Sequence, residues 1–105
     1  MSNLADLLKR AESIRQKYDE LNAKDGHTKW SGLDYTAGLA GDVGDLMKHV
    51  MAKEGKRRGG DVDARIAHEL GDCLWSLLVI ANQYGIDLEA SFTGTMDELE
   101  ERLSA

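Results

Sequence analysis

Apolar side chains recur every three or four residues along most of the chain, which is the spacing of one helix face. This period predicts four helices, over residues 3–23, 33–54, 62–84 and 88–103. Lys24 to Ser31 carries turn residues and connects the first two helices, whereas Gly55 to Gly60 has three glycines and three basic residues and predicts a flexible link. Asp61 is expected to cap the third helix, Gly85 to end it, and Asp87 or a neighbour to start the fourth.

Four helices joined by short links favour an all-α fold, a single four-helix bundle-like domain over residues 1–105. The chain has no proline, so nothing interrupts long helical segments. The stretch from Leu74 to Ala81 is apolar nearly all round and is expected to be the most buried. Because three short neighbours cannot cover it fully, we expect a homo-oligomer, a dimer or a tetramer, with the third helix near the interface.

The charge balance and the cysteine content narrow the function. With 13 basic against 19 acidic residues, the net charge is −6, which disfavours binding of nucleic acid, since phosphate backbones are held by clustered Lys and Arg. No segment has the uninterrupted apolar length that spans a bilayer, so no membrane partner is expected. The single cysteine, Cys73, forms no internal disulfide and is expected to be buried; a cytoplasmic location is the interpretation we adopt.

An acidic turn occurs twice, with an offset of 27 residues. Ala37 to Met47 aligns with Ala64 to Leu74, and the alignment pairs Asp42 with Glu69 and Asp45 with Asp72, together with Gly44 and Gly71. In both helices two carboxylates one turn apart border the apolar stripe. Glycine inside a helix costs about 1 kcal/mol relative to alanine, so the matched glycines suggest a close approach of a second helix or of a ligand.

Packing the two stripes together brings four carboxylates along one seam, where they repel one another. A hard divalent cation relieves this repulsion, since all-oxygen ligands suit Mg²⁺, or Mn²⁺. Mg²⁺ commonly completes its shell with substrate phosphates, so the site predicts a phosphorylated ligand. The alternative is that these acidic residues form a solvated helix face. That interpretation would be favoured if only one such pair were present.

Three segments resemble the MazG-like nucleotide pyrophosphohydrolases: residues 38–46 (GLAGDVGDL), 68–75 (HELGDCLW) and 84–89 (YGIDLE). The resemblance extends from about Trp30 to Arg102. It implies an all-α, oligomeric enzyme that hydrolyses nucleoside triphosphates, with ribose or deoxyribose, to monophosphate and pyrophosphate with Mg²⁺. By resemblance the metal ligands are Asp42, Asp45, Glu69 and Asp72.

If the resemblance holds, Asp42 or Asp45 accepts the proton of the attacking water. Lys48 and Lys53 are candidates for contacting the outgoing pyrophosphate, and Arg102 fits the family pattern at the substrate. Lys56, Arg57 and Arg58 are further candidates, with a solvated loop as the equal alternative.

Three more residues have alternative interpretations. Trp30 either stacks on a nucleobase or packs on the end of the bundle. Viewed down the helix axis, His49 lies at an angle between Asp42 and Asp45. It orients a carboxylate, contacts phosphate or simply completes the helix surface. Asn82 either reads a base edge or contributes to a polar interface.

Some positions differ from the family pattern. The family usually has glutamate where Asp42 and Asp45 stand, and asparagine and lysine where Thr95 and Glu98 stand. Two alternatives therefore remain, a catalytically weak or inactive member that binds metal or nucleotide, and a structural helical oligomerisation module.

Overall fold

The computed structural model describes residues 3–55 and 61–104, and within these residues the chain is all-α, as the period predicts. Its helices are α1 (Leu4–Lys24), α2 (Gly32–Lys53), α3 (Val62–Gln83) and α4 (Leu88–Ser104). Their bounds agree with the expected ranges to within a residue or two. None of the helices in the described residues has both the length and the apolarity needed to cross a membrane.

The helix ends follow from capping side chains and from glycine. Asn3 accepts a hydrogen bond from the Asp6 amide, Ser31 and Asp34 form a capping box, and Asp87 accepts from the Ala90 amide, which confirms the expected start of α4. Gly85, with φ of 63°, stands just beyond α3, as expected.

The expected side-chain cap from Asp61 is wrong. Asp61 does precede α3, but its side chain makes no capping hydrogen bond. Its backbone is left-handed, with φ of 50°, whereas a capping residue needs an extended backbone to aim its oxygen at the first turn.

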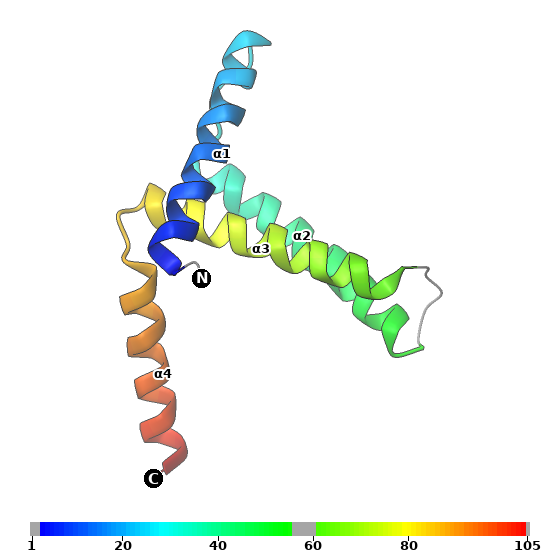
Figure 1. Ribbon diagram of the computed structural model, residues 1–105, viewed down its shortest axis with the longest axis vertical. Coiled ribbons are helices and arrows are strands. Elements are labelled where there is room, and N and C mark those ends of the chain that lie inside the picture. Colours follow the sequence, from blue (N-terminus) through cyan, green and yellow to red (C-terminus); the bar gives the residue numbers. More distant parts are fainter. Residues whose placement is uncertain (1–2, 56–60, 105) are drawn as a thin grey trace.

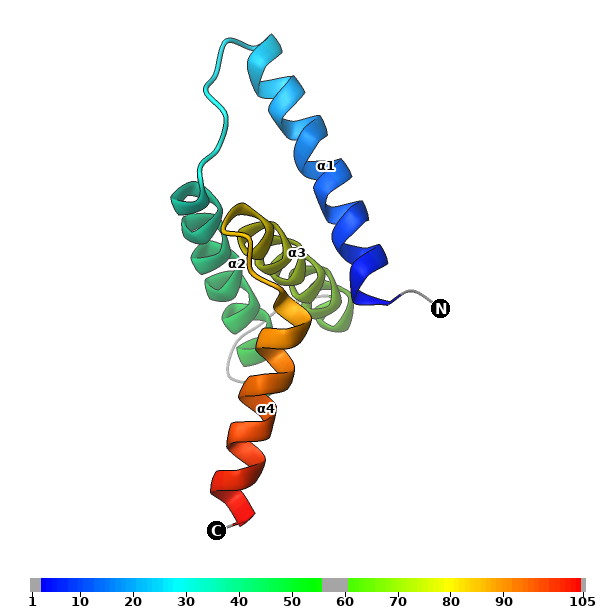
Figure 2. The same ribbon diagram turned by 90° about the vertical axis from the view of Figure 1, so that its left-hand side faces the viewer.

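The helices α2 and α3 lie side by side and antiparallel, while α1 crosses the end where α2 begins and α3 finishes (Figure 1). We call residues 32–41 with 75–83 the covered half of this pair, and residues 42–53 with 62–74 the open half. From the covered half α4 leaves in another direction, away from the pair, and it has no buried residue (Figure 2).

The buried side chains gather in the covered half. Tyr35 is 3% exposed and Val79 is fully buried, and both pack with Leu78 and with Ala11 of α1. The indole N–H of Trp75 donates a hydrogen bond of 3.1 Å to the carbonyl oxygen of Ala11, which ties α1 to α3. The core therefore forms only where a third helix is available to cover the pair.

The open half has no third helix over it. Two apolar stripes with helical spacing are exposed there, Val43, Met47 and Val50 on α2, and Leu70 and Leu74 on α3. Met47 is 60% and Leu70 54% exposed. The expected burial around Leu74 to Ala81 is confirmed for Ser76, Leu78, Val79 and Ala81, whereas Leu74 and Leu77 stay exposed in the single chain.

Candidate metal centre

Three of the four expected carboxylates come together across the seam between α2 and α3. Asp42, Asp45 and Glu69 each offer an oxygen, and these oxygens lie within 4.8 Å of one another. Asp42 and Asp45 are one turn apart on α2, and the antiparallel course of α3 brings Glu69 opposite them. The seam thus holds an all-oxygen group at the start of the open half.

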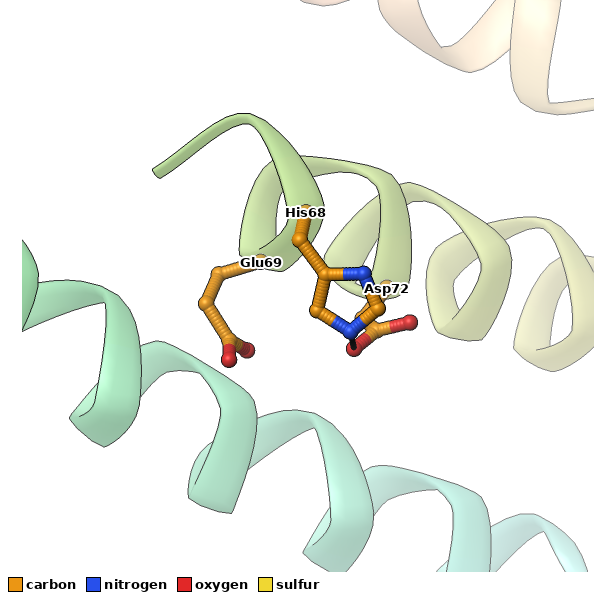
Figure 3. Close-up of side chains that lie close together, drawn as sticks. All are labelled: His68, Glu69 and Asp72. Atoms are coloured by element: carbon orange, nitrogen blue, oxygen red, sulfur yellow. Dashed lines mark ion pairs between the residues drawn. The ribbon is translucent and has the colours of Figure 1, made fainter. Parts of the chain in front are cut away.

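The fourth carboxylate, Asp72, belongs to a second group with His68 and Glu69, whose ligand atoms also lie within 4.8 Å of one another. The Nε2 atom of His68 lies 3.1 Å from an oxygen of Asp72, one turn along α3, while the carboxylate of Glu69 points toward α2 (Figure 3). Glu69 is common to both groups, so it occupies the middle of the acidic seam.

The seam places negative charge in partly buried positions. Partial burial raises the pKa of Asp42, and the nearby Asp72 and Asp45 raise it further, against a lowering by His68. Burial likewise raises the pKa of the Cys73 thiol, with Asp42, Glu69 and Asp72 adding to the effect. Cys73 itself is half-buried, so the expected full burial is not reached.

One oxygen of Glu69, Oε2, is buried and has no hydrogen-bond partner within the described residues. An orphaned carboxylate oxygen among like charges is costly, and a cation removes that cost. The oxygens of Asp42, Asp45 and Glu69 form the donor set that Mg²⁺ or Mn²⁺ prefers, so these residues fit a divalent cation of this kind.

The basic candidates lie farther along the open half. The Nε2 atom of His49 is 3.9 Å from the other oxygen of Glu69, which is beyond hydrogen-bond distance. Lys48 lies 3.9 Å from Asp45 as an exposed pair, and Lys53 pairs with Asp63 at 2.7 Å. Lys56, Arg57 and Arg58 lie outside the described residues.

The matched glycines do not bring α2 and α3 closer together. A Cβ on Gly44 or Gly71 would meet no described atom within 4 Å. The two glycines therefore face open space in the single chain, and the expected close approach of the two helices at these positions is not observed.

The remaining candidates divide between a cavity and the outer surface. Trp30 lines a cavity of about 590 Å³ that also touches Asp42 and Asp72. Asn82 is exposed on α3 and does not line this cavity, and Arg102 lies in the last turn of α4, which runs away from the seam (Figure 1).

Sequence reasoning missed two features of the site. His68 joins it through a spacing of four residues from Asp72, a signal that was readable in the sequence. Tyr18 and Tyr35, which line the cavity beside Trp30, come from separate helices, so no spacing along the sequence connects them.

The chain is thus an all-α protein whose carboxylates meet across two antiparallel helices, in an arrangement that could hold a divalent cation. Comparison with family models specifies it further, because the MazG nucleotide pyrophosphohydrolase domain matches residues 31–104. The chain belongs to this family. Searches of curated proteins and of solved structures find no match. The helix α1 lies outside the matched residues.

Proposed function

We propose that the protein is a Mg²⁺-dependent nucleoside triphosphate pyrophosphohydrolase, which converts its substrate to the monophosphate and pyrophosphate. One observation carries the proposal: Asp42, Asp45 and Glu69 converge within 4.8 Å, with an unpartnered oxygen of Glu69 among them. Membership of the MazG family supplies the substrate class.

Asp42, Asp45, Glu69 and Asp72 would hold the metal. When bound, the cation supplies positive charge to the phosphate oxygens and makes a water easier to deprotonate. Asp42 or Asp45 accepts the proton of the water that attacks the α-phosphorus. The bond from that phosphorus to the oxygen bridging to the β-phosphorus then breaks, and pyrophosphate leaves with this oxygen.

The basic side chains of the open half are suited to the leaving group. Lys48 and Lys53 lie on α2 beyond the carboxylates, and each is about half exposed. Both are within one or two turns of Asp45, so their ammonium groups can reach oxygens of a pyrophosphate that leaves toward the open half. His49 keeps Glu69 oriented, since its ring lies beside the Glu69 carboxylate.

We also propose that a second copy of the chain covers the open half, which gives a homodimer or a homotetramer. Exposed apolar stripes on two adjacent helices form a larger apolar surface than a monomer normally leaves to water. Matched stripes on both helices form a self-complementary surface, as a two-fold interface requires. In such an assembly Arg102, on the helix α4 that extends away from the pair, could reach a substrate bound by the partner copy.

The test is pyrophosphate release from ribo- and deoxyribonucleoside triphosphates with Mg²⁺ or Mn²⁺. We expect metal-dependent release by the wild type and a loss of about 100-fold or more in Glu69→Gln, which keeps the shape but removes a ligand charge. Glu20→Gln, at an exposed position on α1, is the matched control and should keep full activity.

Equal activity in wild type and Glu69→Gln would trace the release to a contaminant and contradict the proposal. Nucleotide binding without any release would instead favour the inactive, binding member of the family.

A further inference from the structure

A histidine stands at the exposed edge of the acidic seam. The Nε2 atom of His68 lies 3.1 Å from Oδ2 of Asp72, and these two residues and Glu69 each offer an atom to a metal ion, all within 4.8 Å of one another (Figure 3). The exposed fraction of the side chain rises from 13% for Glu69 to 45% for Asp72 and 72% for His68. The group therefore leads from the partly buried middle of the seam to the solvent.

A single turn of α3 places all three residues. His68 and Asp72 are four positions apart, so they lie one turn apart on the same face of the helix. Glu69 follows His68 directly, and its carboxylate points toward α2 (Figure 3). Because the three side chains stand on one regular helix, little has to be ordered when an ion binds to them.

Glu69 has an oxygen to spare for this group. It belongs to both groups of possible metal ligands, and each group needs only one of its two oxygens. Its Oε2 atom is buried without a hydrogen-bond partner within the described residues, and its Oε1 atom lies 3.9 Å from Nε2 of His49, beyond hydrogen-bond distance. An orphaned carboxylate oxygen is costly, so it points to a ligand that the neighbouring side chains do not supply.

The two groups differ in the donor atoms that they offer. Asp42, Asp45 and Glu69 offer oxygen only, which suits Mg²⁺, whereas His68 adds an imidazole nitrogen to the second group. Imidazole nitrogen suits transition-metal ions such as zinc, iron and nickel, and the affinity of such sites rises from Mn²⁺ through Co²⁺ to Ni²⁺. The two groups should therefore prefer ions of different classes.

We propose that His68, Glu69 and Asp72 bind a first-row transition-metal ion, with the His68 imidazole as the ligand that sets the preference over Mg²⁺. Three protein ligands leave the remaining coordination positions to water, in keeping with the exposure of His68. The proposal goes beyond the proposed function, because it assigns an ion of another class to a second position and does not require hydrolysis.

The experiment measures Co²⁺ binding to the full chain, first freed of metal with a chelator and then kept in excess Mg²⁺ to occupy the all-oxygen group. Calorimetry gives the affinity, and NMR identifies the imidazole whose ring signals shift and broaden beside the paramagnetic ion. We expect the His68 ring to be the most affected. In His68→Gln the affinity for Co²⁺ should fall about tenfold or more, while the affinity for Mg²⁺, measured alone, should change less than about twofold.

The other two histidines provide the comparison. His27→Gln changes an exposed histidine between α1 and α2 and should leave Co²⁺ binding as it is. A larger loss of Co²⁺ affinity in His49→Gln than in His68→Gln would assign the nitrogen ligand to His49 and contradict the proposal. In chelator His68→Gln should melt like the wild type, because an exposed ion pair contributes little to stability.

Co²⁺ affinity that His68→Gln leaves unchanged overturns the proposal. Equal losses of Co²⁺ and Mg²⁺ affinity also overturn it, because the imidazole then sets no preference. Co²⁺ binding that depends on His68 supports the proposal even if no triphosphate is hydrolysed. Conversely, Mg²⁺-dependent pyrophosphate release without Co²⁺ binding that depends on His68 would support the proposed function and overturn this inference.

Discussion

The covered and open halves of the α2–α3 pair have similar patterns but different surroundings. In the covered half α1 lies across the pair, and Tyr35, Leu78 and Val79 are buried. In the open half an equally regular apolar spacing leaves Met47 and Leu70 more than half exposed. A helical period thus defines a face, but burial requires a partner surface, and the chain supplies one for only half of the pair.

The carboxylates lie where the two halves meet. Asp42 and Asp72 touch the aromatic cavity on one side, and Asp45 and Glu69 face the uncovered seam on the other. The acidic seam therefore borders an aromatic cavity on one side and the uncovered surface of the pair on the other.

The largest expected effect is dissociation of the proposed assembly when a charge is placed in the open half. Leu70→Glu introduces a charge into the exposed stripe of α3, and burying that charge against a second copy would cost more than the interface gains. We expect the proposed assembly to dissociate to monomers, as measured by light scattering at several concentrations.

Ala64→Glu is the control, since it adds the same charge to the same helix about 120° around its axis. An assembly that survives Leu70→Glu unchanged would show that the stripe is not the interface. Dissociation by both variants would point to net charge rather than to this surface.

A smaller effect is expected in the covered half. Trp75→Phe keeps a ring in the core but removes the hydrogen bond from the indole N–H to the Ala11 carbonyl oxygen. The free energy of unfolding should fall by about 1–2 kcal/mol, and the amides of α1 should exchange faster. Chemical denaturation and hydrogen exchange measure the two effects.

Trp30→Phe is the matched control, because Trp30 is half-exposed and its indole makes no hydrogen bond within the described residues. We expect a smaller loss of stability and unchanged exchange in α1. If hydrogen exchange in α1 is the same in Trp75→Phe as in the wild type, the hydrogen bond from Trp75 to Ala11 does not hold α1 against the α2–α3 pair.

The smallest expected effect is a change in melting temperature on substitution of Asp42, where the covered and open halves meet, and it depends on pH. The pKa of Asp42 is raised in the folded chain, mainly by burial. Such a carboxyl favours the folded state below its unfolded pKa, and this contribution is lost as pH rises through the folded pKa. Without metal, Asp42→Asn should therefore raise the melting temperature by about 2 °C at pH 7 and by nothing below about pH 3.

With added Mg²⁺ the wild type should melt above Asp42→Asn, because the wild type gains stability from a ligand that the variant binds less well. Asp97→Asn, an exposed change on α4, should leave the melting curve as it is. If metal-free Asp42→Asn melts below the wild type, the ionised Asp42 carboxylate stabilises the folded chain at neutral pH instead of destabilising it.

Much of the fold could be predicted from the sequence, because spacing, capping residues and glycine act locally. The bounds of all four helices in the described residues follow from them, as does the meeting of Asp42, Asp45 and Glu69 once two faces are packed. The Asp61 cap fails because side-chain type does not determine backbone conformation. The place of α1 was not predictable, since its apolar spacing defines one face but not the surface that this face packs against.

The part of the site that escaped prediction depends on tertiary contacts. The cavity needs Tyr18, Trp30, Tyr35 and Trp75 from three separate segments, and no local spacing connects them. Helix–helix contacts at long sequence separation decide such features.

The repeated acidic turn on antiparallel helices has a consequence for how the proposed substrate would be oriented. Because the matched segments run in opposite directions, Asp42 and Asp45 on α2 correspond to Glu69 and Asp72 on α3, so the acidic seam taken alone presents similar carboxylates toward both of its ends. A row of phosphates could therefore lie along such a seam in either direction. The helix α1 covers one end only, so in the proposed enzyme the two directions would no longer be equivalent.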